Sequence, residues 1–370
     1  MSSRKNIFMG KRVLVTGATG FKGSWLCVWL LKLGANVFGI SKDIPTKPSL
    51  YEVLGLENKI KHYFIDIRDF PVLKKIIIEE IKPHFIFHLA AQAIVSKSYE
   101  DPLETITTNV LGTAHILEVL RDYPAFCVAV IITSDKCYNN VEWVWGYREN
   151  DKLGGKDIYS ASKASAENIF YAYFHSFFKK NSDHLRIATA RAGNVIGGGD
   201  WAKDRIVPDC MKSWSKGKKV KIRNPSATRP WQHVLEPLSG YLTLAYHLYH
   251  NESLSGESFN FGPSAEAVYT VQHLIEKMAV IWDYSKEIYQ VIPSEFHEAG
   301  LLKLNCDKAL MKLNWKATLN FDETVNFTVS WYKRFYSSSK DDIYEFTLHQ
   351  IREYEKIAIS RKIEWTQLFL

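Results

Sequence analysis

The sequence predicts an α/β protein built on a doubly wound parallel sheet, and two observations support this prediction. Short apolar runs that suit buried strands alternate with stretches of helical length through the N-terminal half of the chain. A glycine-rich turn joins the first of these runs to the first helix. Strands that are apolar along their whole length are typical of parallel sheets with helices on both faces.

The individual elements follow from local signals. We expect strands at residues 12–16, 35–40, 61–65, 85–89 and 128–133, and helices at residues 23–33, 73–81 and 107–121. Gly34 ends the first helix and Pro83 follows the second, because glycine suits the turn after a helix and a proline disfavours helical geometry in the residue before it. These elements define a Rossmann-type domain over residues 8–195.

After this domain the pattern becomes less regular, since prolines and glycines interrupt the chain. We expect residues 196–229 and 256–335 to form a smaller, mixed substrate-binding lobe, with residues 230–255 returning to the Rossmann-type domain. Residues 336–370 are expected to hold a serine-rich linker, a helix at 343–359 and an apolar tail. We expect this tail to pack on the protein's own core rather than on a partner subunit.

The composition excludes several classes of protein. Of the 370 residues, 46% are hydrophobic and 24% are charged, an ordinary balance for a globular enzyme. The net charge of +7 is mild, and the densest basic run, residues 216–223, suits a solvated face or an anion-binding rim, so no nucleic-acid partner is expected. Five scattered cysteines without a C-x-x-C pair argue against disulfides and zinc sites. No signal peptide or membrane-spanning run is visible, which predicts a cytoplasmic protein with no membrane partner.

The turn at residues 16–23, Thr-Gly-Ala-Thr-Gly-Phe-Lys-Gly, has the form of a dinucleotide-binding loop. Its three glycines allow a tight turn, close approach of the backbone to a pyrophosphate, and tight packing of the helix on the strand. The helix that follows presents unpaired N–H groups to the phosphates. The expected cofactor contacts in this turn are Gly17, Thr19, Gly20, Phe21, Lys22 and Gly23.

Residues after the later strands are expected to complete the cofactor site. Asp43 follows the second strand, where a carboxylate binds the ribose 2′-hydroxyl, so NAD is favoured, although Lys42 would tolerate the 2′-phosphate of NADP. His88 suits a hydrogen-bonded strand-end histidine better than a catalyst. The remaining expected cofactor contacts are Asp66, Ile67, Leu89, Ala90, Ala91, Asn109 and Thr133. A helix or turn cap is the structural alternative for Asp66, and a brace between loop and helix is the alternative for Asn109.

A phenol and an ammonium lie four residues apart at Tyr159 and Lys163, on one face of a helix. Lowering the pKa of a tyrosine from about 10 to about 7 requires roughly 4 kcal/mol. One ammonium about 4 Å away supplies about that much at an effective dielectric constant near 20, and a nicotinamide cation nearby would add to it. The pair therefore suits a phenolate general base, although an ordinary helix-surface pair has the same pattern.

A third group of polar residues closes the strand before this helix. Ser134, Asp135 and Lys136 lie at the carboxyl edge of the sheet, where such folds bind ligands. In a row they offer a hydrogen-bond donor, a general acid and a general base, and the alternative is a surface turn. The glycine turn, this tripeptide and the Tyr159–Lys163 pair follow in an order and spacing that bring all three to one edge of the sheet.

In this combination the chain resembles the extended short-chain dehydrogenase/reductase family, and within it the nucleotide-sugar 4,6-dehydratases. The resemblance covers roughly residues 8–335. Dehydratases that use thymidine nucleotides have Thr-Asp-Glu where this chain has Ser-Asp-Lys. The segments at 143–149, 191–201 and 228–237 are instead similar to the branch of the family that acts on CDP-glucose.

The resemblance implies a loss of water from a nucleotide sugar with no net oxidation, through tightly bound NAD. Tyr159 would be the base at C4, with Lys163 lowering its pKa, and Ser134 would donate a hydrogen bond near the C4 oxygen. Asp135 would protonate the departing C6 hydroxyl. Lys136, if partly neutral, would remove the C5 proton, or else it would only stabilise an enolate. The implied substrate contacts are Gln92, Ser134, Asn194, Arg205 and Arg229.

Two other functions stay open at the level of sequence. A 4-epimerase needs Tyr159 and Lys163 but no acid and base for elimination, so Asp135 and Lys136 count against it. A non-catalytic NAD-binding regulatory protein would have lost some of these four residues. The resemblance also implies a homodimer that pairs through the Tyr159 helix, or a homotetramer, and a role in making deoxysugars for surface polysaccharides such as the O-antigen of lipopolysaccharide.

Overall fold

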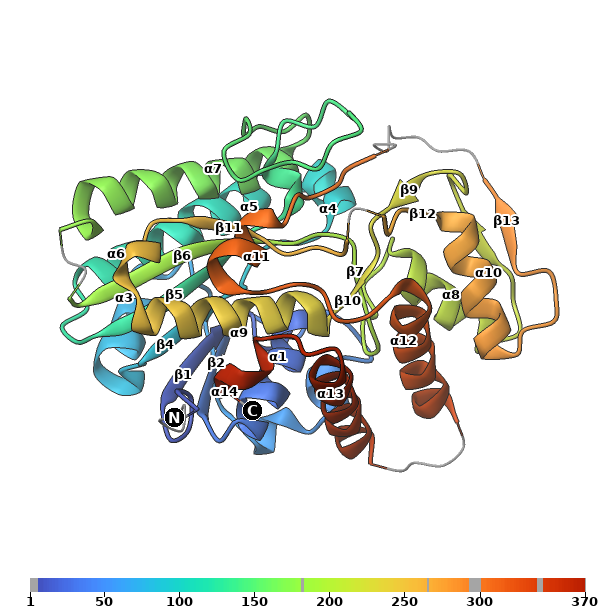
Figure 1. Cartoon of the computed structure of the whole chain (residues 1–370), viewed down its shortest axis with the longest axis horizontal. Helices are drawn as coiled ribbons and strands as arrows, with labels where there is room; N and C mark the ends of the chain where they lie inside the picture. Colours follow the sequence, from blue (N-terminus) through green and yellow to red (C-terminus); the bar gives the residue numbers. More distant parts are fainter. Residues whose placement is uncertain (1–5, 181–182, 265, 293–300, 338–341, 370) are drawn as a thin grey trace.

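The computed structural model describes residues 6–180, 183–264, 266–292, 301–337 and 342–369 (Figure 1). Its centre is a seven-stranded sheet with the strand order β11-β6-β5-β4-β1-β2-β3, in which all neighbouring strands run parallel. The strands are β1 (Arg12–Thr16), β2 (Asn36–Ser41), β3 (Lys61–Phe64), β4 (Phe85–His88), β5 (Cys127–Ile132), β6 (Leu185–Arg191) and β11 (Ser258–Asn260). The predicted doubly wound parallel sheet is confirmed.

Helices cover both faces of this sheet because successive strand residues point to opposite sides. Along β1, Val13 and Val15 lie in the core shared with α1 (Phe21–Lys32) and α9 (Leu235–His250). Leu14, between them, lies in the core shared with the helices on the other face. Those helices are α3 (Phe70–Lys75) with its continuation η2 (Ile76–Ile81), η3 (Thr107–Leu111), α6 (Gly112–Arg121), and α7 (Ile158–Tyr173) with η5 (Phe174–Phe178). Figure 1 shows α6 and α7 on the side of the sheet opposite α9.

Short elements fill the connections between strands and helices. They are α2 (Leu50–Val53), η1 (Leu56–Asn58), α4 (Val95–Glu100), α5 (Pro102–Ile106), η4 (Asp135–Cys137) and η6 (Glu252–Leu254). Side-chain caps fix where several helices begin. Asp157 caps α7 by accepting a hydrogen bond from the backbone N–H of Ser160 at 2.9 Å, which places Tyr159 in the first turn of that helix.

The second lobe lies to one side of the sheet, at the right of Figure 1. Its helices are α8 (Ile206–Trp214), α10 (Val271–Trp282) and α12 (Phe321–Tyr336), and its short strands pair as β8 (Val220–Ile222) with β13 (Tyr289–Val291) and β9 (Thr228–Arg229) with β12 (Tyr269–Thr270). A further pair, β7 (Val195–Ile196) with β10 (Gln232–His233), lies where the chain passes between the two parts. Strand β11 differs from the expected boundaries, because residues 258–260 pair with β6 in the main sheet instead of joining the lobe. The helix α11 (Asp307–Leu313) packs near β11 and α9.

The C-terminal segment packs on the protein's own core, as predicted. Helix α13 (Ile343–Ser360) and the short α14 (Thr366–Phe369) lie against α1. Within this contact Trp29 meets the rings of Tyr354 and Trp365 at centroid distances of 5.7 and 6.0 Å. Most of the predicted linker, residues 338–340, lies outside the described residues.

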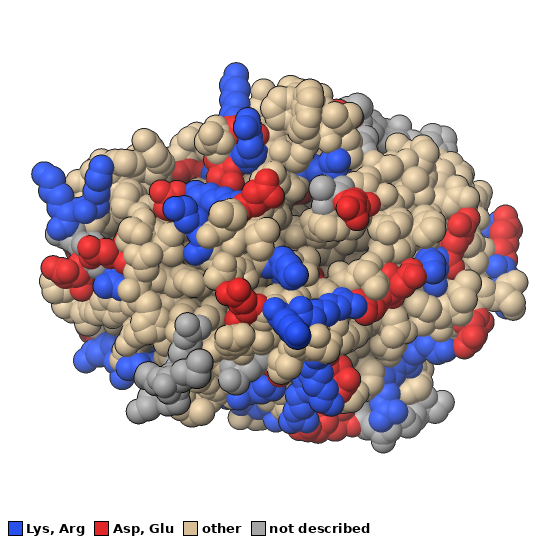
Figure 2. Space-filling view, in the orientation of Figure 1, with Lys and Arg blue, Asp and Glu red and all other residues tan. Residues whose placement is uncertain are grey.

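Charged side chains of both signs are interspersed over the face of the molecule shown in Figure 2. Within the part of the chain that the structure describes, no helix is both long and apolar enough to span a bilayer.

Candidate active site

A cavity of about 680 Å³ lies at the carboxyl ends of the sheet strands. Its walls contain residues that directly follow β1, β2, β4 and β5, as expected for ligand sites in doubly wound sheets. The loop at residues 199–205 lines the cavity from the side of the second lobe. A hydrogen bond of 2.8 Å from Ser96 to Asp204 joins this loop to α4 across the mouth of the cavity.

The glycine turn between β1 and α1 forms one end of the cavity. Gly17 has a φ of +75°, and a Cβ there would lie 2.9 Å from the backbone nitrogen of Ala90. A Cβ on Gly23 would lie 2.1 Å from the carbonyl oxygen of Gly17, so only glycine allows the helix to come this close to the turn. Around Gly20 no atom lies closer than 3.3 Å to such a Cβ, and no side chain caps the first N–H groups of α1. The turn therefore fits a pyrophosphate at the amino end of the helix.

The next part of the cavity has the features expected for an adenosine site. Thr19 ties the turn to the end of β2, since its hydroxyl donates to the carbonyl oxygen of Asp43 at 2.7 Å. Lys42 forms an ion pair with Glu104 at 3.1 Å. Asp66 forms an ion pair with Arg68 at 2.6 Å, and the hydrogen bond from Arg68 lowers the pKa of this carboxyl. Asp43, Asp66 and Ile67 all line the cavity.

The segment after β4 forms another wall, to which Leu89, Ala90, Ala91 and Gln92 contribute. Gln92 donates from its side-chain amide to the hydroxyl of Thr105 at 2.9 Å. Asn109 accepts from the backbone N–H of Gln92 at 2.8 Å and donates to Ser162 on α7 at 2.9 Å, and it does not belong to the lining residues. These bonds brace the loop after β4 against α7, as the structural alternative for Asn109 expects, and its cofactor contact stays a prediction.

His88 has the structural role expected for it. Its ring nitrogens form hydrogen bonds with the hydroxyls of Thr16 at 2.7 Å and Thr113 at 3.2 Å. Burial lowers the pKa of this imidazole to about 3, so the ring is neutral and structural.

Tyr159 and Lys163 line the cavity from α7, and both side chains are almost fully buried. Burial raises the pKa of Tyr159 to about 12, although a hydrogen bond with Ser134 and the charge of Arg205 act in the opposite direction. The lowering of this pKa that we expect from Lys163 and a nearby nicotinamide cation stays a prediction for the complex with the cofactor. Burial also lowers the pKa of Lys163 to about 8, because the ammonium has lost water.

Ser134, Asp135 and Lys136 begin the short helix η4 after β5. The Ser134 hydroxyl donates to the carboxylate of Asp135 at 2.9 Å and accepts from the backbone N–H of Lys136 at 3.2 Å. Thr133 and Ser134 line the cavity, whereas Asp135, with 4% of its surface exposed, lies behind them and is not among the lining residues. Lys136 is half-buried and also lies outside the lining set.

Among the predicted substrate contacts, Gln92, Ser134 and Arg205 line the cavity, whereas Asn194 and Arg229 do not. Arg205 lines the cavity and forms an ion pair with Asp200 at 2.8 Å. Asn194 donates to Asp135, the predicted acid, at 3.3 Å. Arg229 lies on β9 in the second lobe, where its guanidinium donates to the carbonyl oxygen of Thr228 at 2.8 Å. Neither Asn194 nor Arg229 belongs to the described lining of the cavity.

This geometry can be compared with known proteins. A family model described as GDP-mannose 4,6-dehydratase matches residues 14–328. A CDP-glucose 4,6-dehydratase from Salmonella typhimurium is 48% identical over 332 residues, which cover 89% of this chain and 92% of that protein. The chain belongs to this family of nucleotide-sugar 4,6-dehydratases.

Other similar proteins have lower sequence identity to this chain. A dTDP-glucose 4,6-dehydratase from Haemophilus influenzae is 25% identical over 343 residues, 86% of this chain and 97% of that protein. The solved structure of a UDP-glucose 4-epimerase from Thermotoga maritima matches 88% of this chain and 99% of its own with a TM-score of 0.76 and 23% identity. DesIV from Streptomyces venezuelae, a dTDP-glucose 4,6-dehydratase solved with NAD bound, covers 87% and 97% with a TM-score of 0.74 and 20% identity. These structural likenesses confirm the fold.

Lys22 was predicted as a cofactor contact, but the residues that surround its ammonium in the structure were not predicted from the sequence. Its ammonium donates to the hydroxyl of Tyr241 on α9 at 3.5 Å. Burial lowers the pKa of Lys22 to about 8, with further lowering by the charges of Arg205 and Lys163 and an opposing effect of Asp135. Lys22 therefore faces the catalytic groups as well as the turn. No local sequence pattern identifies Tyr241 as a site residue, because a tyrosine in an apolar helix is usually part of the hydrophobic core.

Proposed function

We propose that the protein is a CDP-glucose 4,6-dehydratase, a hydro-lyase that converts CDP-D-glucose to CDP-4-keto-6-deoxy-D-glucose and water. The observation that carries this proposal is the meeting of two sets of groups at one end of the sheet. Tyr159 and Lys163 suit an oxidation at C4, and Ser134, Asp135 and Lys136 suit an elimination across C5 and C6. The 48% identity to the Salmonella typhimurium dehydratase supports the cytidine nucleotide and the glucose.

The cofactor that fits the glycine turn and the Asp43 wall is NAD. When bound, it would supply the hydride acceptor for C4 and, once reduced, the hydride donor for C6. The choice of NAD over NADP is supported by two neighbours, since Asp43 lines the cavity while the ammonium of Lys42 is held by Glu104 at 3.1 Å. A lysine that is paired with a carboxylate offers little to a 2′-phosphate, whereas a carboxylate suits a 2′-hydroxyl.

In the oxidation half of the reaction, Tyr159 takes the proton of the C4 hydroxyl while Ser134 holds the C4 oxygen. The raised pKa of Tyr159, about 12, means that the phenol is protonated in the protein alone. A fixed positive charge beside it, which the oxidised cofactor carries, favours the phenolate. Lys163 would hold the nicotinamide ribose, and its ammonium adds to the positive potential at this wall.

In the elimination half, the new C4 ketone makes the C5 proton acidic. Lys136 takes that proton and Asp135 gives one to the departing C6 hydroxyl. Asp135 accepts hydrogen bonds from Ser134 and Asn194, which fix its two oxygens. Loss of water leaves a double bond between C5 and C6. Lys136 then returns its proton to C5, while the reduced cofactor would supply the hydride for C6.

Binding of the nucleotide sugar completes the scheme. Arg205, at the cavity wall, suits one phosphate of the substrate pyrophosphate through bidentate contacts. Arg229, on the second lobe, would meet the pyrophosphate if the lobe closes on the substrate. Gln92 and Asn194 supply amide contacts near the hexose.

We further propose that the protein is a homodimer in the cytoplasm, or a homotetramer made of two such dimers. Large apolar side chains are exposed along the helices before and within the Tyr159 region: Leu103 (72%), Ile106 (40%), Leu111 (46%) and Tyr171 (62%). An isologous contact between copies would cover them.

All five cysteines are free thiols, which suits a reducing compartment. The 4-keto product suits the synthesis of deoxysugars for surface polysaccharides.

A substrate panel tests the proposed function. The purified protein with NAD is incubated separately with CDP-, dTDP-, UDP- and GDP-hexoses, and the base-labile absorbance of a 4-keto sugar is recorded. We expect this absorbance with CDP-glucose. Turnover confined to a non-cytidine nucleotide, or product that is only the C4 epimer, would reject the assignment.

A further inference from the structure

A buried ion pair lies directly behind the catalytic groups, and no step of the reaction uses it. Glu167 on α7 and Arg191 at the end of β6 are 2% and 3% exposed, and their closest atoms are 2.8 Å apart. Two guanidinium nitrogens of Arg191 donate to the two carboxylate oxygens of Glu167, at 3.0 and 2.8 Å. Burial alone would raise the pKa of Glu167, but the charge and hydrogen bonds of Arg191 outweigh burial and lower it.

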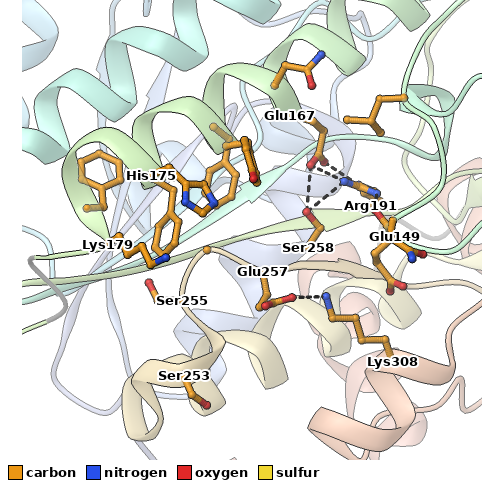
Figure 3. Close-up of a pocket in the computed structure, with 18 of the residues that line it drawn as sticks. Glu149, Glu167, His175, Lys179, Arg191, Ser253, Ser255, Glu257, Ser258 and Lys308 are labelled. Carbon is orange, nitrogen blue, oxygen red and sulfur yellow. Dashed lines mark hydrogen bonds and ion pairs between the residues drawn. The ribbon is translucent and has the colours of Figure 1, made fainter.

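The pair belongs to the floor of a second cavity of about 890 Å³ (Figure 3). Figure 3 shows Arg191 and Glu167 facing each other directly, with Ser258 beside them, and this serine forms hydrogen bonds with both. On its other side the pair contacts the active site, because the hydroxyl of Thr133, which lines the first cavity, donates to Glu167 at 2.5 Å. The ion pair thus lies between the two cavities.

The contacts of the pair enclose the segment that carries the elimination groups. Thr133, at one end of this segment, is held by Glu167. Tyr138, at its other end, accepts a hydrogen bond from Arg191 at 2.7 Å. Between the two lie Ser134, Asp135 and Lys136. The same carboxylate stands one helical turn after Lys163 and two turns after Tyr159 on α7.

We propose that the Glu167–Arg191 pair is a positioning device that clamps both ends of residues 133–138 and fixes the elimination acid and base relative to the Tyr159–Lys163 helix. One rigid group then sets the distance between the oxidation site and the elimination site. A buried ion pair whose donors all have hydrogen-bond partners is rigid, because any movement that breaks these bonds leaves a buried charge unpaired and costs free energy. This proposal rests on the proposed function for the identity of the steps, but the clamp itself is a property of the chain.

Tyr138→Phe tests the clamp at one end. The tyrosine hydroxyl accepts from Arg191 and donates to Asn260 at 2.8 Å, and the variant removes only that oxygen from a side chain that is 1% exposed. The matched control is Tyr123→Phe, which also removes one buried hydroxyl, bonded to the carbonyl oxygen of Pro83 at 2.9 Å, away from the site. Removal of Glu167 or Arg191 would leave a buried charge without its partner, so those variants are avoided.

The first measurement is hydrogen–deuterium exchange of the amides of Lys136, Cys137 and Tyr138, which hydrogen-bond within the segment. We expect exchange at these amides to rise about tenfold or more in Tyr138→Phe and to stay unchanged in Tyr123→Phe. Equal exchange in both variants would overturn the clamp, whatever the substrate proves to be.

The second measurement is steady-state turnover of CDP-glucose with NAD. We expect kcat of Tyr138→Phe to fall by about tenfold or more, with KM within about twofold, because misplacement of reacting groups by fractions of an ångström acts on the chemical step. Reduced nicotinamide should accumulate, since oxidation then outruns elimination. A kcat no lower than that of Tyr123→Phe would contradict the positioning role. If the wild type turns over no CDP-glucose, the proposed function fails while the exchange measurement still decides the clamp.

Discussion

At Tyr159, burial and the negative charges of Asp135 and Asp157 raise the pKa of the phenol, whereas two other neighbours lower it. The cavity wall removes water and raises the pKa to about 12, while Ser134 and Arg205 lower it by smaller amounts. The expectation from sequence compared the required shift with the effect of one ammonium at about 4 Å and a nearby nicotinamide cation, but it did not include the loss of solvation. The phenolate therefore depends on a further positive charge at the site, so the base is expected to form in the complex with the oxidised cofactor and not in the protein alone.

Lys136 is the residue at which the two halves of the mechanism can be separated. Lys136→Ala should still allow oxidation at C4, because Tyr159, Lys163 and Ser134 are untouched, but it should slow exchange of the C5 hydrogen with solvent by about 10²–10⁴-fold. The exchange is measured in deuterated water by nuclear magnetic resonance of recovered substrate and product. Exchange at the wild-type rate would show that Lys136 is not the base and only stabilises the enolate.

At the scale of elements, Glu236 joins three parts of the chain that are distant in sequence. From α9 its carboxyl accepts from the backbone N–H groups of Thr318 and Leu319, at 2.8 and 2.6 Å, and from the hydroxyl of Tyr354 on α13 at 2.8 Å. Burial raises its pKa to about 7, in spite of these hydrogen bonds, which lower it. The anchoring of α13 and of the segment before α12 on α9 is thereby linked to pH.

The sign of this linkage gives a prediction for stability. The folded pKa of about 7 lies above the ordinary value of 4.5, so the stabilising contribution is complete below about pH 4.5 and is lost as the pH rises through about 7. The loss amounts to about 3 kcal/mol. Glu236→Gln has no such titration, so its free energy of unfolding should gain about 3 kcal/mol relative to the wild type between pH 4.5 and 7.5. Urea unfolding of both proteins across this range measures the difference, and a constant difference would contradict the linkage.

At the scale of the whole molecule, the sequence predicted five of the seven strands of the sheet and many of the residues that line the cavity. Strand β6 was missed, because its residues, Leu-Arg-Ile-Ala-Thr-Ala-Arg, do not form a continuous apolar run. Apolar runs such as residues 128–133 suit the interior strands of a doubly wound sheet, because helices cover both faces of those strands. The turn at residues 16–23 predicts where a dinucleotide binds. The three-residue strand β11 was missed, since so short a run carries no periodicity. The contacts of Lys22 with Tyr241 and of Glu167 with Arg191 were also missed. They join residues far apart in the chain, and only tertiary packing brings them together.

The central claim is that oxidation at C4 and reduction at C6 occur on one sugar in one cavity. CDP-glucose that carries deuterium at C4 tests it most directly, with nuclear magnetic resonance and mass spectrometry of the 4-keto-6-deoxy product. We expect deuterium at C6 of the product, because the cavity keeps the hydride from solvent and from other substrate molecules between the two transfers. A 4-keto-6-deoxy product with only hydrogen at C6 would contradict the account.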